Sequence, residues 1–329
     1  MTNNEKVYKL AKDYGFDECA IISSEPFYRY KQDLDYNNYG EDFNINYDPS
    51  AYKSDGKYIV VLIKSYKPYK QEHFTKDHIY IDAYYVTGNA SYFRAKEMSQ
   101  DIVEMGHIAH FSPRIPYRHC ALRAGFGRRG MNGLLVNKKY GSYMHIQCIL
   151  TDMPLDITSD IKKVDTCNKC GKCVLACKGT ALNGTGRVEM KNCIRHYMPA
   201  KRYVPEKMRN NVGSSFIGCT DCRTSCPYNV KIEAIEPHKD LLEACYIPIL
   251  IDKGHELYKK HFNILQKYLG TNEVRPLKLL KSVVIVIGNI KDKKYLNMLK
   301  KLRRENNDED LLEYIDWAIG EIKKGLNNI

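Results

Sequence analysis

No stretch of this 329-residue sequence stays apolar over the ~18 residues that a membrane-spanning helix needs. The N-terminus, from Met1 to Lys12, is polar and charged and lacks the apolar core of a signal peptide. The chain also has a single tryptophan, and no acidic residue lies between Met105 and Asp152. We therefore expect a cytoplasmic protein without membrane association, in which one long segment offers no carboxylate for acid–base chemistry.

Cysteine, in contrast, is abundant, and eight of the 12 cysteines fall between positions 167 and 226. They form the run Cys167-x2-Cys170-x2-Cys173-x3-Cys177, the lone Cys193, and the run Cys219-x2-Cys222-x3-Cys226, which Pro227 follows. Such spacing is typical of proteins with two 4Fe–4S clusters, in which the last cysteine of a run often ligates the other cluster. We predict one cluster on Cys167, Cys170, Cys173 and Cys226, and a second on Cys177, Cys193, Cys219 and Cys222.

Two other interpretations of the cysteines stay open at this point. Structural zinc sites usually take pairs of CxxC rather than a run of four cysteines. A disulfide framework would suit a secreted chain, but clustered cysteines without a signal peptide favour a reducing compartment. The other four cysteines are expected mostly to be buried apolar filler: Cys19, Cys120, Cys148 and Cys245.

Positive charge is concentrated around the cysteines. Residues 161–230 hold 13 Lys and Arg against 4 Asp and Glu, whereas residues 1–160 hold equal numbers and the whole chain carries +12. Two oxidised clusters bring about −4 with their thiolates, which offsets part of this charge. The remainder indicates either a solvated basic face or a surface for a polyanion such as tRNA. The candidate RNA contacts are Lys201, Arg202, Lys207 and Arg209.

The chain is expected to form three parts: an α/β domain over residues 1–155, a two-cluster ferredoxin-like domain of loops and short helices over 156–234, and an all-α domain over 235–329. In the first part, residue spacing predicts helices over 5–14 and 90–105, strands over 19–22 and 58–64, and a long loop over 24–51. Two further strand-like segments, 133–136 and 144–150, are expected to pair as a hairpin around residues 138–141.

The third part shows three amphipathic stretches, over residues 276–290, 294–304 and 308–323. The last stretch places five apolar side chains on one face: Leu311, Leu312, Ile315, Ile319 and Ile322. Short paired helices of this kind resemble a HEAT-type repeat. The alternative is an ordinary helical cap that covers one side of the cluster domain.

With these motifs in place, the chain resembles the epoxyqueuosine reductases, which are cobalamin-dependent iron–sulfur enzymes of tRNA modification and share their plan with reductive dehalogenases. The resemblance covers nearly the whole length. It rests on residues 167–228 with the lone Cys193 and the ending Gly218-Cys-Thr-Asp-Cys-Arg-Thr-Ser-Cys-Pro-Tyr-Asn229. It rests also on Ala124-Gly-Phe-Gly-Arg-Arg-Gly-Met-Asn132, which is similar to the family's AGLGWxGKN segment.

The resemblance implies that the first domain binds cobalamin or another corrinoid. The implied contacts are Ala124, Gly125, Phe126, Gly127, Gly130, Asn132, Gly141 and Ser142. Glycine would let the backbone approach the corrin plane or its phosphate-ribose tail closely. A Rossmann nucleotide site is not indicated, because no βαβ unit with an acidic residue about 20 positions further on follows the glycines.

The chain departs from the family's pattern on the substrate side. The resemblance implies a catalytic Asp in a D-x-x-P pattern, where this chain has Pro113-Arg114-Ile115-Pro116. The candidate proton donors are then Tyr117 and His119, with Cys120 less favoured. Because His titrates near neutrality, His119 is the best chemical substitute for the Asp. A surface His in a basic loop is the alternative interpretation of His119. Arginines at 114, 118 and 123 would favour an anionic substrate.

We therefore expect a corrinoid-dependent, two-cluster iron–sulfur reductase of the epoxyqueuosine-reductase type, acting in queuosine biosynthesis or on a different substrate. The expected partners are tRNA and a reduced ferredoxin or flavodoxin-type electron donor. The alternatives are an electron-transfer protein without substrate chemistry of its own and a reductive-dehalogenase-like enzyme.

Overall fold

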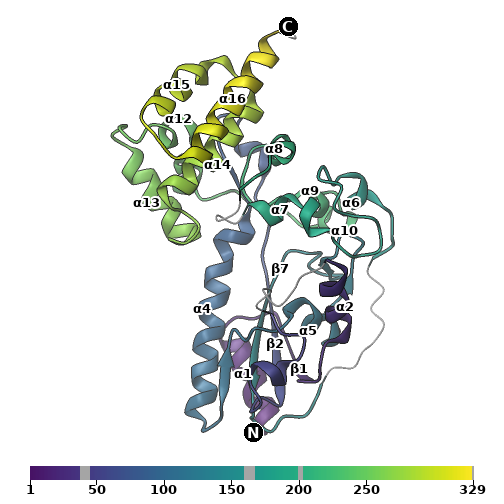
Figure 1. The fold of residues 1–329 in the computed structure, drawn as a ribbon. Helices are drawn as coiled ribbons and strands as arrows, with labels where there is room; N and C mark the ends of the chain where they lie inside the picture. The colour runs from purple at the N-terminus through teal and green to yellow at the C-terminus, as the bar shows by residue number, and fades with distance from the viewer. Residues whose placement is uncertain (38–44, 159–166, 199–202, 328–329) are drawn as a thin grey trace.

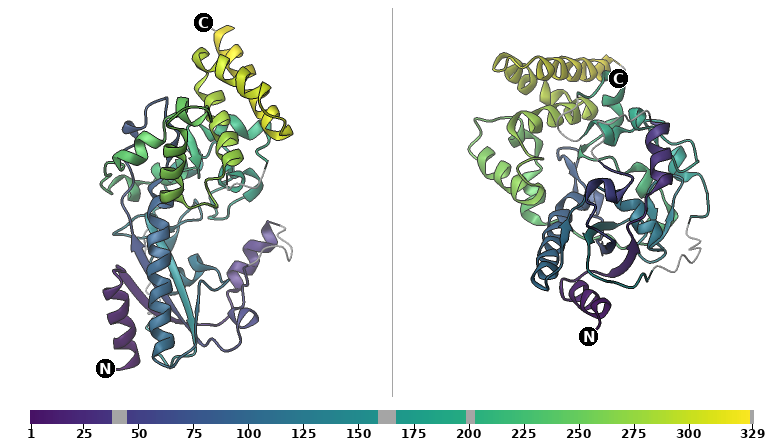
Figure 2. Two further views of the ribbon diagram at one scale, coloured as in Figure 1. Left: turned by 90° about the vertical axis from the view of Figure 1, so that its left-hand side faces the viewer. Right: turned by 60° about the horizontal axis from the view of Figure 1, so that its bottom comes forward.

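The computed structural model describes residues 1–37, 45–158, 167–198 and 203–327. The N-terminus lies at the end of the molecule that holds the sheet, and the C-terminus lies at the opposite, helical end (Figures 1 and 2). The short helices of the cysteine-rich segment lie between these two parts (Figure 1). No helix in the described ranges is long and apolar enough to cross a membrane.

A four-stranded antiparallel sheet forms the centre of the first part, in the order β1-β2-β7-β4. Its strands are β1 (Glu18–Ser23), β2 (Tyr58–Ser65), β7 (Met144–Thr151) and β4 (Ala109–Phe111). The helices α1 (Asn3–Asp13) and α4 (Ala83–Glu104) pack on one face, and α5 (Tyr117–Arg123) packs on the other. Because both faces are covered, Ile59 to Ile63 of β2 are fully buried, which explains why this strand reads as one continuous apolar run.

Three predictions for this part need correction. The segment predicted as a long loop over 24–51 contains α2 (Tyr28–Tyr36) and α3 (Pro49–Tyr52). The helix α4 begins seven residues earlier than expected, because the Asp82 carboxylate caps it by accepting a hydrogen bond from the Tyr84 amide at 2.7 Å. The predicted hairpin is wrong: β6 (Leu135–Val136) pairs with β5 (Arg128–Arg129), because β2 and β4 already occupy both edges of β7.

The cysteine-rich part is built from loops and short helices, as predicted. The helices are α6 (Lys172–Leu175), α7 (Ile194–Tyr197), α8 (Glu206–Val212), α9 (Asp221–Thr224) and α10 (Pro227–Val230), with the 3₁₀ turn η2 (Met190–Asn192). One strand, β8 (Ser215–Ile217), pairs in parallel with β3 (Tyr80–Ile81), and the turn η1 (Gln71–His73) precedes β3. This pairing attaches the cysteine-rich part to the chain just before α4.

The C-terminal part is helical, which confirms that prediction. Its elements are α11 (Lys239–Ala244), α12 (Ile247–Leu250), α13 (Tyr258–Leu269), α14 (Pro276–Ile290), η3 (Lys293–Tyr295), α15 (Leu296–Arg304) and α16 (Glu309–Asn327). The helices α14 and α16 pack closely, since a Cβ added to Gly288 would lie 2.3 Å from the Trp317 ring. Met208, Phe216 and Leu279 belong to one core, so the helical part and the cysteine-rich part are joined by apolar packing. The HEAT-type arrangement and the three domain boundaries stay predictions.

Candidate iron–sulfur and cofactor site

The structure brings the first predicted cysteine group together. Cys167, Cys170, Cys173 and Cys226 surround one small cavity, which Gly130 and Asn132 also line. Gly171 takes a left-handed conformation (φ 76°) that turns the chain between Cys170 and the start of α6. Burial and the neighbouring thiolates, Cys226 first, raise the pKa of Cys173. A bound cluster would lower the pKa of this thiol again, because a metal-bound thiol is deprotonated.

The second group also comes together, around Cys222. Burial, followed by the charges of Cys219, Cys193 and Cys177, raises the pKa of Cys222 to about 12. Cys193 lies directly before α7, and Cys219 follows Gly218, whose added Cβ would meet the Tyr85 hydroxyl at 2.6 Å. The grouping therefore matches the one predicted from the spacing, while the role of the eight thiolates as ligands stays a prediction.

The arrangement of the thiols bears on the zinc alternative. A single zinc ion requires sulfur atoms about 2.3 Å from one point. Within the described residues, no group of three or more His, Cys, Asp or Glu side chains is placed to hold a single metal ion. A 4Fe–4S cluster instead takes one thiolate at each corner iron, so its ligands stand farther apart. The donor chemistry of the two groups fits such clusters.

A cavity of about 700 Å³ lies beside the second group, and we call it the cofactor cavity. All four cysteines of that group line it, together with Tyr84 and Tyr85 from α4, Tyr117 and Arg118 from α5, and Met144 and Ile146 from β7. The cavity has the size of a site for a large organic ligand. Ser142 also lines it, and its hydroxyl is buried without a hydrogen-bond partner among the residues that the structure describes. An unsatisfied buried hydroxyl is costly, so this group fits a polar atom of a bound cofactor.

The eight predicted corrinoid contacts do not all line the same cavity. Only Asn132 and Ser142 line the cofactor cavity. Asn132 is 4% exposed, and its amide donates to the Cys222 carbonyl at 3.0 Å, so it fixes the loop of the second cysteine group. Gly127 and Gly141 must be glycine because other parts of the protein lie too close for a side chain. A Cβ added to Gly127 would lie 2.4 Å from the Val136 carbonyl oxygen, and one added to Gly141 would lie 2.0 Å from the Asn229 side chain.

The other members of this set pack within the protein. Ala124 is buried in the core under the sheet, and Phe126 packs against that core. Gly125 has φ 75° at the turn that ends α5, where only glycine is relaxed. Gly130 lines the small cavity of the first cysteine group. As corrinoid contacts these residues stay predictions.

The two predicted proton donors point in different directions. Residues two positions apart on a helix lie about 200° apart around its axis. Tyr117 lines the cofactor cavity, where its hydroxyl donates to Ser112 Oγ at 3.2 Å, and burial raises its pKa far above the usual range. His119 is absent from that lining and faces α2, with its Nε2 3.4 Å from Asp33 Oδ2 and its ring beside Tyr30. Burial lowers the pKa of His119 more than the Asp33 carboxylate raises it.

Asp33 is the buried acid beside the predicted site segment that sequence reasoning missed. Its side chain is 14% exposed and accepts a hydrogen bond from Arg129 Nη1 at 2.6 Å, and Arg187 Nε lies 3.5 Å away. Burial opposes ionisation, but the nearby His119 ring and the hydrogen bond from Arg129 outweigh it and lower the pKa of Asp33 to about 2. The sequence indicates this role only indirectly. The basic segment between Met105 and Asp152 has no acidic residue, so an acid from another part of the chain can balance its charge.

Of the arginines predicted to favour an anionic substrate, only Arg118 lines the cofactor cavity. It has no hydrogen-bond or ion-pair partner among the described residues. Its side chain is exposed, but the surrounding protein removes part of its hydration and, with the charge of Arg129, lowers its pKa. Arg123 instead donates to the carbonyls of Ser23, Glu25 and Pro26 and stacks on Phe27 at 3.7 Å, so the expectation for Arg123 is corrected.

Comparison with known proteins agrees with this geometry. Residues 166–229 match the model of the 4Fe-4S double cluster binding domain. The epoxyqueuosine reductase of Lactococcus garvieae is 31% identical over 208 residues, which cover 62% of this chain and 57% of that protein. The chain is a homologue of the epoxyqueuosine reductases. It spans little more than half the length of the first curated relatives it matches, although a Cyclobacterium marinum epoxyqueuosine reductase is 26% identical over 77% of this chain and 89% of its own length.

Solved structures show that the fold is shared as well. The epoxyqueuosine reductase of Streptococcus thermophilus superposes with a TM-score of 0.78 at 21% identity, covering 98% of this chain and 91% of that protein. An epoxyqueuosine reductase in complex with a modified tRNA stem loop superposes with a TM-score of 0.66 at 20% identity, covering 97% of this chain and 98% of its own. The α/β part, the two-cluster domain and the helical C-terminal region of these epoxyqueuosine reductases are therefore all present in this chain.

Proposed function

We propose that this protein is a corrinoid-dependent, two-cluster iron–sulfur reductase of the epoxyqueuosine-reductase type. The observation that carries the proposal is the order of the sites: the first cysteine group reaches the surface at Cys170, and the second lines the cofactor cavity. When bound, two clusters and a corrinoid would supply single-electron chemistry along that line. The homology to epoxyqueuosine reductases supports the same assignment.

The chain's own residues would bind, orient and shield the reacting groups. Asn132 holds the loop of the second cysteine group, Ser142 offers its free hydroxyl, and Arg118 supplies a positive charge inside the cavity. Arg223 lies beside Cys222 and forms a buried ion pair with Asp82. The Arg223 guanidinium lies near the second cysteine group, where it would partly offset the negative charge that a cluster takes up on reduction, while Asp82 neutralises it in the oxidised state.

Proton supply is where this chain differs from the family's pattern. By the resemblance, Pro113 stands where the family's D-x-x-P Asp is expected, and of Tyr117 and His119 only Tyr117 lines the cofactor cavity. Its hydroxyl donates its one proton to Ser112, so it would have to turn away from Ser112 to donate that proton into the cavity. We infer that epoxyqueuosine itself is a poor substrate and that Arg118 selects an anionic one.

For the electron donor we propose an acidic ferredoxin or flavodoxin-type protein. Cys170 is exposed, and the exposed Lys169 and Lys172 lie next to it in the sequence. Complementary charge speeds association of such partners. The electron-carrier alternative shares this surface but needs no cofactor cavity, and the size of that cavity favours an enzyme.

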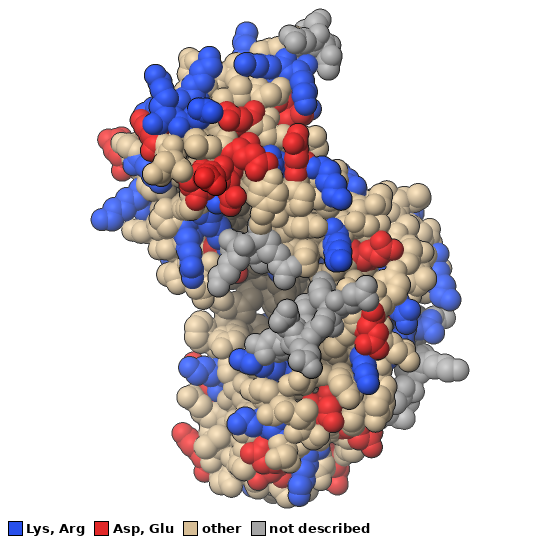
Figure 3. Space-filling model, in the orientation of Figure 1, with Lys and Arg blue, Asp and Glu red and all other residues tan. Residues whose placement is uncertain are grey.

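For tRNA binding, one of the four predicted contacts is corrected. Arg209 is fully buried, pairs with Glu313 at 2.7 Å and lies over the Tyr314 ring, so the prediction that it contacts RNA is wrong. Lys207 is exposed and stays a candidate, while Lys201 and Arg202 lie outside the described residues. Figure 3 shows a hollow between the helical part and the sheet-containing part, with Lys and Arg on both sides. The related structure that holds a tRNA stem loop supports RNA as the partner.

Metal analysis of anaerobically purified protein tests the proposal. We expect roughly eight iron and eight sulfide per chain, because two 4Fe–4S clusters need all eight thiolates. Stoichiometric zinc without inorganic sulfide would refute it.

A further inference from the structure

A second cavity, of about 760 Å³, lies on the other face of the sheet. Successive side chains of a strand point to opposite faces. Met144 and Ile146 of β7 line the cofactor cavity, whereas His145 between them lines this one. The remaining walls come from the end of β2, the first half of α4, the segment 231–238 and α13. The two cavities share no lining residue, and the proposed reduction makes no use of the second.

Charge in the second cavity is mostly positive. Five cationic side chains and a single carboxylate line it: Lys64, Lys67, Arg94, Lys139, Lys231 and Glu233. Lys64 is paired with Asp17 at 3.3 Å, and Lys67 with Glu233 at 2.5 Å. Within the described part of the chain, the other three cations have no carboxylate at ion-pair distance. We call this site the basic cavity, because its concave wall focuses their positive potential on an anion.

Aromatic rings form another part of the wall. His238 and Tyr268 are stacked, with ring centroids 5.3 Å apart and planes at 24°. His145, which is 4% exposed, lies 4.8 Å from the ring of Tyr66, and its Nε2 is hydrogen-bonded to Thr87 Oγ1 at 2.8 Å. Rings of this kind stack on nucleobases, and Arg and Lys bind phosphate oxygens. The volume falls within the range of small-molecule sites.

We propose that the basic cavity binds a nucleoside monophosphate unit, with its base against these rings and its phosphate held by Arg94, Lys139 and Lys231. The unit is either a free nucleotide or a nucleotide extruded from an RNA, since both present the same chemistry. This proposal is independent of the reductase assignment, because binding at this cavity requires neither a corrinoid nor turnover.

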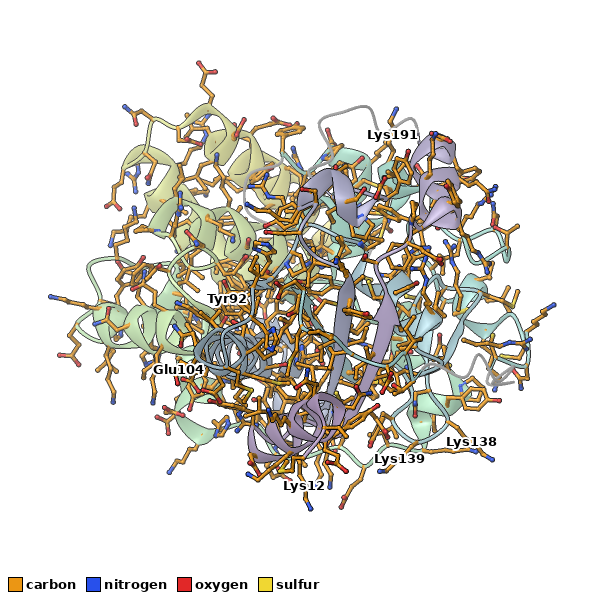
Figure 4. The ribbon with its side chains drawn as sticks, turned by 90° about the horizontal axis from the view of Figure 1, so that it is seen from below. Lys12, Tyr92, Glu104, Lys138, Lys139 and Lys191 are labelled. Carbon is orange, nitrogen blue, oxygen red and sulfur yellow. The ribbon has the colours of Figure 1, made fainter. Side chains whose placement is uncertain are left out.

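The test is calorimetric titration of the cluster-loaded protein with the four nucleoside monophosphates, their nucleosides and inorganic phosphate. Arg94→Ala and Lys139→Ala should each weaken nucleotide binding about tenfold, the loss expected for one charge-assisted hydrogen bond. Lys96→Ala and Lys138→Ala are matched controls, because both residues are neighbours in the same elements but neither lines the cavity. Figure 4 shows Lys138 and Lys139 side by side at the edge of the molecule. The controls should bind as the unmodified protein does.

An unmodified tRNA anticodon stem-loop distinguishes the two sources. If it displaces the nucleotide and its own binding weakens in Arg94→Ala and Lys139→Ala, the ligand is a nucleotide of an RNA. If nucleotides bind and the stem-loop does not displace them, the ligand is a free nucleotide. The proposal is overturned if neither probe responds to the two variants beyond the response of the controls. Inorganic phosphate that binds as tightly as the nucleotides would also overturn it.

Discussion

Asp33 of α2 and Arg129 of β5 form a hydrogen-bonded ion pair of 2.6 Å, nearly one hundred positions apart in the sequence. The same carboxylate lies 3.4 Å from His119 and 3.5 Å from Arg187. Three basic groups from α5, β5 and the cysteine-rich part therefore share one acid. The contact fixes α2 against the segment that the family resemblance places at the cofactor.

Replacing Asp33 by Asn should destabilise the protein by about 2 kcal/mol at pH 7, given a pKa lowered from 3.8 to about 2. A lowered carboxylate pKa contributes stability above the unfolded value, and this contribution is lost as the pH falls from about 4 toward 2. Urea unfolding at pH 7 checks the loss. Asp35→Asn is the matched control, because Asp35 is exposed on the same helix. Equal losses in the two variants would contradict the role of the ion pair.

His145 should make the protein less stable in mild acid. Burial, with the positive charge of Arg223, lowers its pKa from 6.5 to about 4. Between pH 6.5 and 4, His145 is protonated in the unfolded chain but not in the folded chain. The free energy of unfolding therefore decreases as the pH is lowered from 6.5 to 4. Between pH 7 and 5.5 the loss should be about 1 kcal/mol. Urea midpoints of wild type and His145→Gln should show it as a pH-dependent difference, and parallel profiles would contradict it.

Much of the fold could be predicted from local patterns. The buried strand β2 and the last three helices, α14, α15 and α16, follow from apolar spacing within short windows. The two cysteine groups followed from spacing alone, because cluster ligation imposes short, fixed intervals on the chain. The structure assembles the same two sets of four.

Contacts between distant segments could not be predicted. The partner of β6 was missed because pairing depends on which strand edges are already occupied, and no single segment carries that information. Asp33 was missed because its role exists only once α2 packs against α5 and β5. Arg209 looked like a surface cation, yet an aromatic cage from α16 and the carboxylate of Glu313 bury it.

Single cysteine substitutions should separate the two clusters. Cys170→Ser should remove the signal of the first cluster, and Cys193→Ser that of the second, because each belongs to a different group of four. Electron paramagnetic resonance of the reduced proteins, with iron analysis, measures this. Cys245→Ala is the control, since this buried cysteine lies outside both groups and should leave the iron content unchanged. Loss of both signals in either cluster variant would contradict the assignment.

Epoxyqueuosine-tRNA should be turned over slowly or not at all. A placed acid contributes about 10²–10⁴-fold in rate, and Pro113 stands where the family's Asp is expected. Queuosine quantified by nucleoside mass spectrometry, with cobalamin and a strong reductant present, tests this. Turnover equal to that of an Asp-containing relative would contradict it. Any residual activity should fall in Tyr117→Phe and persist in His119→Ala, because only Tyr117 lines the cofactor cavity.

The visible spectrum of cobalamin after gel filtration with the reconstituted, reduced protein tests the central claim most directly. We predict that cobalamin elutes with the protein at micromolar concentrations, and that its cobalt is reduced only when both clusters are loaded, because the cofactor cavity adjoins the second cysteine group. Cobalamin that elutes apart from a protein carrying both clusters would contradict the reductase assignment and favour the electron-carrier alternative.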